Sequence, residues 1–104
     1  NAGSFFKNPV VQTGKYDSLK KEFSSLVAYP AGEGRMKLAA GWLIEQCGWK
    51  GKTLGNAGVH EKQALVLVNK GNAKGEEVIA LSEKVKLSVK EKFGVELETE
   101  VNIY

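Results

Sequence analysis

The sequence predicts an α+β domain in which a small, mostly antiparallel sheet packs with about three helices. Apolar residues recur every three or four positions over residues 75–93, which predicts a long amphipathic helix. Apolar and polar residues alternate over residues 95–104, a pattern typical of a half-buried strand. Residues 64–68 form an unbroken apolar run, and the spacing around Glu61-Lys62 favours an antiparallel hairpin.

The first third of the chain predicts an extended segment, a short helix and a loop. Residues 3–12 should be extended, with a turn or bulge at Asn8-Pro9. Asp17 is a candidate N-cap for a helix whose apolar stripe is spaced at i, i+4 and i+7. Residues 29–34 are rich in turn formers and should form a loop.

A second helix is expected over residues 38–47, because its apolar residues share one face and Gly48 follows as a C-cap. The glycine-rich residues 55–60 are ambiguous, and we expect them to be extended. The run over residues 64–68 should be a central strand, since it is apolar on both faces. Gly94 should end the long helix.

Composition describes an ordinary globular domain. The chain has 104 residues, 42% of them hydrophobic and 26% charged, which fits one domain with its own core. No apolar run approaches the roughly 20 residues that span a bilayer, so we expect no membrane segment. The net charge is +3, but Arg35 is the only arginine and the lysines are dispersed, so we expect no nucleic-acid partner.

Cysteine usage and the amino end point to a cytoplasmic origin. Cys47 is the only cysteine, which rules out an internal disulfide and a CxxC site. Its apolar surroundings favour a small buried hydrophobe. The amino end shows no basic stretch followed by an apolar run, so no signal peptide is visible.

Few residues suggest chemistry by themselves. Glu96, Glu98 and Glu100 share one strand face at intervals of about 6.6–7 Å, which favours a solvated face. If that face were covered, the pKa of at least one carboxyl would rise and suit acid catalysis. Ser4 is not part of a GxSxG elbow, and we interpret His60 as structural. Glycine-rich phosphate motifs and metal-ligand patterns are absent from the sequence.

Four stretches in the same order nevertheless resemble one family. They are Gly-Ser-Phe-Phe-Lys-Asn-Pro at residues 3–9, Leu-Ala-Ala-Gly-Trp-Leu-Ile-Glu-Gln at residues 38–46, the segment at residues 59–69, and residues 93–101. Together they resemble the C-terminal domain of the UDP-N-acetylenolpyruvoylglucosamine reductases, the MurB family. The resemblance spans nearly the whole chain and implies one substrate-binding domain over residues 1–104.

The resemblance implies a two-step reduction in bacterial peptidoglycan synthesis, which serves cell-wall biogenesis, cell shape and cell division. Reduced FAD delivers hydride to an enolpyruvyl ether, NADPH recharges the flavin, and protonation of the adjacent carbon gives UDP-N-acetylmuramate. Ser4 corresponds to the proton donor, because a weak acid suffices when the carbon is strongly basic and the donor is well placed. Glu100 corresponds to an acid that stabilises the enolic intermediate, which requires a raised pKa in the complete enzyme.

The resemblance also implies contacts with the substrate, UDP-N-acetylenolpyruvoylglucosamine. Asn8 and Gln63 match positions that contact the nucleotide sugar, Asn8 near its diphosphate, and both can donate and accept hydrogen bonds. Lys7 is a further candidate for the phosphates, with surface shielding as the alternative. Asn102 stands where the family often carries arginine, so a charge contribution from that position is in doubt.

The family binds FAD in domains upstream of this one, which are absent from this chain and would be its natural partners. We therefore expect the chain alone to bind no flavin, to require no metal and to reduce nothing. Two alternatives remain open at this point. The chain could be a nucleotide-sugar-binding module without chemistry, or a structural interaction domain.

Overall fold

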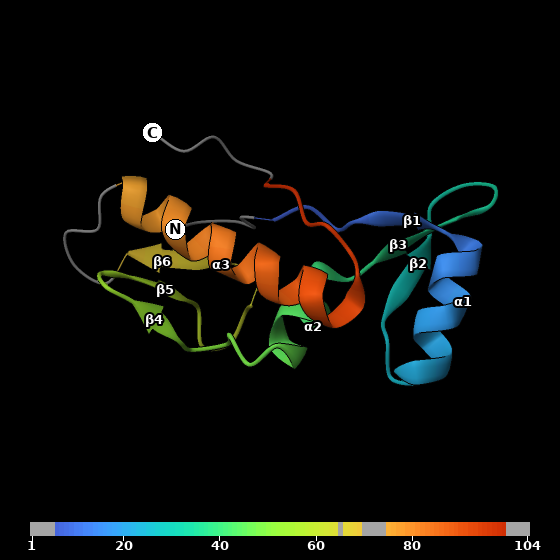
Figure 1. Ribbon diagram of the computed structural model, residues 1–104, viewed down its shortest axis with the longest axis horizontal. Coiled ribbons are helices and arrows are strands. Elements are labelled where there is room, and N and C mark those ends of the chain that lie inside the picture. Colours follow the sequence, from blue (N-terminus) through green and yellow to red (C-terminus); the bar gives the residue numbers. More distant parts are fainter. Residues whose placement is uncertain (1–5, 65, 70–74, 100–104) are drawn as a thin grey trace.

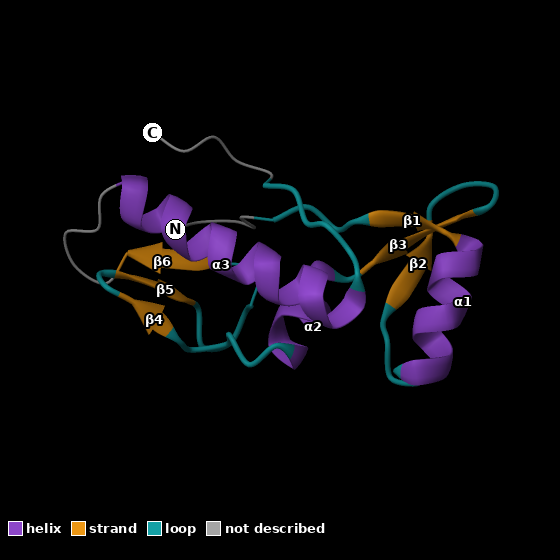
Figure 2. Ribbon diagram, viewed as in Figure 1, coloured by secondary structure: helices purple, strands orange, loops and turns teal. Residues whose placement is uncertain are grey.

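The computed structural model describes residues 6–64, 66–69 and 75–99. Within them the fold is α+β, as predicted, with all strand pairs antiparallel (Figures 1 and 2). The strands form two three-stranded sheets instead of the one sheet expected. The elements in chain order are β1 Val10–Gln12, α1 Thr13–Glu22, β2 Ala28–Pro30, β3 Arg35–Leu38, α2 Ala40–Gln46, β4 Thr53–Leu54, β5 Ala57–Val59, β6 Leu67–Asn69 and α3 Gly75–Phe93.

The first sheet has the order β1-β3-β2 and is packed against α1 at one end of the elongated molecule (Figure 1). The helix begins at Thr13, directly after β1. Asp17 therefore lies inside the helix, and the prediction that Asp17 is its N-cap is wrong. Gln12, still extended at φ −72° and ψ 153°, stands at the cap position. The helix buries Leu19, and its last turn carries two lysines that suit the helix dipole.

The second sheet has the order β4-β5-β6, and α3 lies across it (Figure 1). The central strand is β5, whose three residues are all buried, while β6 lies at one end of the order. Among the described strands, the central strand expected at residues 64–68 is therefore found at the edge of the order, as β6 over Leu67–Asn69. The glycine-rich segment therefore supplies the buried central strand, and α3 packs in contact with it.

The long helix has the bounds that the apolar period predicts, Gly75–Phe93. The second predicted helix begins later than expected, since Leu38 is the buried last residue of β3. Three aromatic rings join the ends of different helices. Phe23 follows α1 and lies 4.8 Å from Phe93 at the end of α3, and Trp42 of α2 lies 5.7 Å from Phe93 between ring centroids.

After α3 the chain turns at Gly94, whose φ is +69°. Val95 and Leu97 are then buried, and Glu96 and Glu98 are exposed, so the predicted alternation is confirmed over this part. Regular strand pairing is limited here to one bridge at Thr99. In the part of the chain that the structure describes, no helix is both long and apolar enough to cross a membrane.

Candidate functional site

The two segments that lead toward the ends of the chain meet in the structure. Phe6 and Thr99 form an antiparallel bridge, and the backbone N–H of Lys7 donates a 2.8 Å hydrogen bond to the carbonyl oxygen of Glu98. Phe6 is 1% exposed, so burial of its ring anchors the pairing in the core. The N–H of Leu38 donates a 2.8 Å bond to the carbonyl of Pro9, which fixes the same segment to β3.

This bridge lies close in sequence to Ser4 and Glu100, the two residues predicted to be catalytic. Ser4 is two residues before Phe6, and Glu100 directly follows Thr99 in the sequence. Ser4, Glu100 and Asn102 themselves lie outside the described residues, so their predicted roles are untested. The described structure brings the segments that lead to Ser4 and Glu100 into contact.

Asn8 links the amino-terminal segment to α2. Its side-chain Oδ1 accepts a 2.9 Å hydrogen bond from the backbone N–H of Ala40, the first residue of that helix. The cap residue Ala39 has no side-chain acceptor, so Asn8 satisfies one of the unpaired N–H groups from 32 positions away. Because Oδ1 is occupied, the two Nδ2–H donors remain for an external acceptor. The exposed side chain of Lys7, next in sequence, has no hydrogen-bond or ion-pair partner among the described residues.

Gln63 lies in the connection between β5 and β6. The Nδ1 atom of His60 accepts backbone hydrogen bonds from Lys62 at 3.0 Å and from Gln63 at 3.2 Å. The carbonyl of Gln63 in turn accepts the N–H of Val66 at 3.0 Å. His60 thus orders the turn, in agreement with its structural interpretation, and the Gln63 side chain is left exposed.

The described titratable groups include two of the three carboxylates of the predicted strand face and the cysteine Cys47. Glu96 and Glu98 are exposed, which fits the solvated-face interpretation of these two carboxylates. Burial raises the pKa of the Cys47 thiol, and the nearby positive charge of Lys92 partly opposes the shift. Within the described residues, no group of three His, Cys, Asp or Glu side chains could hold a metal ion.

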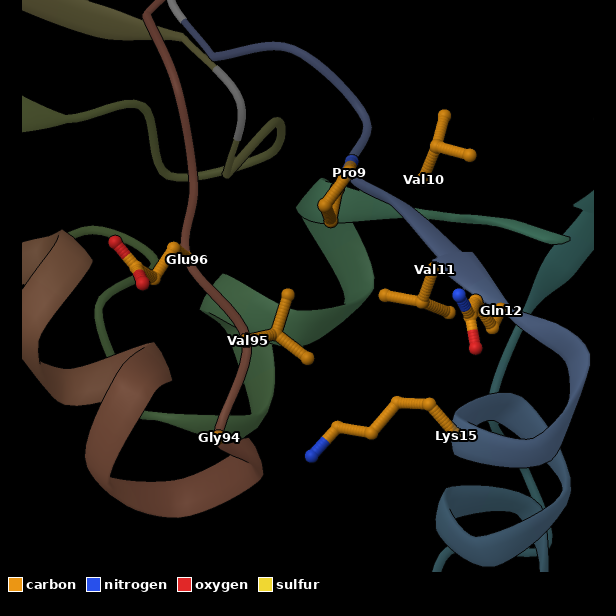
Figure 3. A pocket seen from close by; sticks show the side chains of 8 residues that line it. All are labelled: Pro9, Val10, Val11, Gln12, Lys15, Gly94, Val95 and Glu96. Atoms are coloured by element: carbon orange, nitrogen blue, oxygen red, sulfur yellow. The ribbon is translucent and has the colours of Figure 1, made fainter. Parts of the chain in front are cut away.

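A hollow of about 490 Å³ lies between the start of the first sheet and the segment after α3 (Figure 3). Val11 and Val95 face each other across it, and Lys15 extends along its floor toward Gly94. A Cβ atom at Gly94 would lie 2.9 Å from the Lys15 ammonium nitrogen. No local sequence pattern predicts this hollow, because its walls come from residues 9–15 and 94–96, which are far apart in the chain.

Comparison with known proteins agrees with the four motifs. The family model described as "UDP-N-acetylenolpyruvoylglucosamine reductase, C-terminal domain" matches residues 1–104. Proteins named UDP-N-acetylenolpyruvoylglucosamine reductase are 60% identical in Paraburkholderia phymatum, 58% in Paraburkholderia phytofirmans and 57% in Burkholderia vietnamiensis, each over 100 residues. Each match covers 96% of this chain and 29% of the relative. The chain therefore belongs to the UDP-N-acetylenolpyruvoylglucosamine reductase family and corresponds to its C-terminal domain.

Proposed function

We propose that this chain is the substrate-binding part of a longer flavoenzyme that reduces UDP-N-acetylenolpyruvoylglucosamine to UDP-N-acetylmuramate with NADPH. The reaction belongs to peptidoglycan synthesis in the bacterial cytoplasm. The relatives carry the reductase name, and the chain spans only 29% of their length, which leaves ample sequence for flavin-binding domains. The observation that carries the proposal is the Phe6–Thr99 bridge, because it joins the segments leading to Ser4 and Glu100.

Ser4 is proposed as the proton donor. A flavin bound outside these 104 residues would supply the hydride, and the substrate carbon next to the carboxylate would then be strongly basic. A serine hydroxyl is a weak acid, but such a carbon accepts its proton when the hydroxyl is fixed within hydrogen-bond reach. Glu100, held protonated, donates a hydrogen bond to the enolic oxygen, whereas an ionised carboxylate would repel the charge that develops there.

Four further side chains are proposed to hold the nucleotide sugar. Asn8 directs its Nδ2–H donors at the diphosphate, a role supported by the hydrogen bond that occupies its Oδ1 atom. Gln63 is exposed on an ordered turn and can donate and accept hydrogen bonds. Lys7 adds positive charge beside Asn8. Asn102 stands near Glu100 in sequence and offers a polar contact without charge.

Replacing Ser4 by alanine in the full-length reductase tests the proposal. Turnover should fall by about two to four orders of magnitude, the usual contribution of a positioned acid, while substrate binding changes little. Ser18→Ala is the matched control, since Ser18 is an exposed serine on α1. Unchanged turnover in Ser4→Ala would remove the proton-donor role. Lost substrate binding with unchanged turnover of the bound complex would favour a binding module without chemistry.

The flavin part of the proposal is tested on the 104-residue chain itself. We expect it to bind no FAD and to reduce nothing, because the family holds FAD in other domains. Titration of the chain with FAD, followed by flavin fluorescence and gel filtration, measures this directly. A yellow chromophore that comigrates with the chain would overturn the expectation.

A further inference from the structure

One face of the first sheet carries no covering element among the described residues. Helix α1 contacts β1 and β3 from one side, where Leu19 is buried. On the opposite side the antiparallel register places Lys37 between Val10 of β1 and Tyr29 of β2, in one row across three strands. Gln12 lies opposite Arg35 in the neighbouring row. We refer to these side chains as the open face: Val10, Gln12, Tyr29, Arg35 and Lys37.

The open face has the composition of a contact surface. Val10 is 49% exposed and Tyr29 is 51% exposed, and they are two of the five large exposed hydrophobic side chains of the described chain. Single exposed apolar residues need no explanation, but here two of them flank one cation within a single row. Tyrosine and arginine are enriched in protein interfaces.

Charge limits what can cover this face. Its two ionisable cations are Arg35 and Lys37, and it contains no acidic side chain. A two-fold contact between identical copies would set this patch against itself and bring like charges together. A partner that presents carboxylates would instead pair with both cations.

The surface continues beyond the sheet. Val10 and Gln12 also line the hollow of about 490 Å³, whose apolar walls include Val11 and Val95 (Figure 3). The β1 strand is at the end of the sheet order, so its outer edge faces this hollow without a neighbouring strand among the described residues. Val11 and Lys15 place the hollow toward the α1 side of the sheet, so it adjoins the open face only along the β1 edge.

We propose that the open face packs against an acidic surface of the reductase polypeptide outside these 104 residues. The relatives are more than three times as long as the matched part, so the same polypeptide supplies a large partner. This inference rests on the proposed function, in which the chain works as one domain of the longer enzyme. Apolar contacts to Val10 and Tyr29 stabilise the docked state, and carboxylates opposite Arg35 and Lys37 set its orientation.

The test uses the purified, monomeric full-length reductase. Zero-length carbodiimide cross-linking, followed by mass spectrometry, should join Lys37 to a carboxylate outside these 104 residues of the same polypeptide. In a parallel lysine-acylation experiment, Lys37 should react at least about fivefold more slowly than Lys21, an exposed lysine on α1. The reason is that the Lys37 amine is accessible to the reagent only in the small fraction of molecules in which the face is undocked. The variant Arg35→Glu, which keeps the Lys37 amine, should strongly weaken the cross-link, and Lys84→Glu, with the same charge change at an exposed lysine of α3, should preserve it.

The proposal is wrong if Lys37 and Lys21 react at the same rate and no cross-link forms. Cross-links between two copies, or to another protein, would overturn it as well, because they would assign the face to a different occupant. Turnover of the UDP sugar is measured on the same preparation. An inactive wild-type enzyme would argue against the proposed function alone, while an active enzyme with an unprotected Lys37 would argue against the docking alone.

Discussion

The side-chain amide of Asn8 and the backbone N–H of Ala40 are joined by a 2.9 Å hydrogen bond across 32 positions of sequence. Through it, the segment proposed to bind the substrate also completes the amino end of α2. The contact gives Asn8 two separable functions, because its oxygen serves the fold and its nitrogen is free for a ligand. Substitutions that keep one end of the amide and change the other can therefore distinguish them.

Asn8→Asp and Asn8→Ala form a matched pair for this purpose. Asn8→Ala removes the acceptor and should lower the free energy of unfolding by about 1 kcal/mol, as for other capping side chains. Asn8→Asp keeps an acceptor for Ala40 and should nearly preserve stability. Chemical denaturation of the chain measures both effects. Equal destabilisation by the two variants would show that the capping bond contributes little.

The same pair separates stability from substrate binding in the full-length enzyme. Asn8→Asp removes the Nδ2–H donors and places a negative charge near the proposed diphosphate position, so KM should rise by at least about tenfold, or 1.4 kcal/mol. Asn8→Ala should raise KM less, since it adds no charge. Steady-state kinetics with the UDP sugar tests whether Asn8→Asp raises KM more than Asn8→Ala does. A KM for Asn8→Asp equal to that of the wild type would remove Asn8 from the diphosphate site.

The aromatic contact between Phe23 and Phe93 should carry a large share of the packing between the two ends of the molecule. Phe93 is 3% exposed, and its ring also lies against Trp42. Phe93→Ala should therefore cost about 3–5 kcal/mol of unfolding free energy. Leu87→Ala on the same helix is the control, because Leu87 is 56% exposed and its loss should change stability by no more than about 0.5 kcal/mol. Similar losses for both variants would contradict the assignment of the core.

Two glycines should respond to alanine with opposite signs. Gly94 has φ +69°, a conformation that alanine adopts only with strain, so Gly94→Ala should destabilise the chain by about 1–2 kcal/mol. Gly14 lies within α1 and has no atom within 4 Å of the new methyl group, so Gly14→Ala should stabilise by up to about 1 kcal/mol. Thermal unfolding of both variants gives the comparison. The Lys15 ammonium near Gly94 can move aside, so the destabilisation by Gly94→Ala comes from backbone strain.

Cys47 should report on its surroundings through its reaction with iodoacetamide. Burial raises the pKa of its thiol above the ordinary value of 9.0, so the folded chain has less reactive thiolate than the unfolded chain near that pH. The unfolded thiol loses its proton first, so this group makes stability fall as pH rises past 9.0. Lys92→Gln should raise the pKa of Cys47 further and slow alkylation, while Lys90→Gln serves as the control. Identical pH–rate curves for the folded and unfolded chains would refute the shift.

The sequence by itself determined the parts of the fold that repeat over a local period. The apolar stripe of α3 predicted its bounds, Gly75–Phe93, because a long helix needs one continuous face against the core. Alternation predicted which of residues 95–98 are buried, and the spacing around Glu61-Lys62 predicted antiparallel pairing, seen between β5 and β6. Four motifs in order also identified the family, and with it Ser4 and Glu100 as candidates that no local pattern distinguishes.

Only the tertiary structure decided which distant segments meet. Leu38 is apolar and close to a helical stripe, yet pairing with Ala28 makes it the end of a strand. The Asn8–Ala40 bond and the Phe6–Thr99 bridge likewise depend on chain closure over long separations. The physical reason is that such contacts gain their energy from the packed core and not from neighbours in sequence. A local pattern therefore contains no trace of them, and the division into two sheets was missed for the same reason.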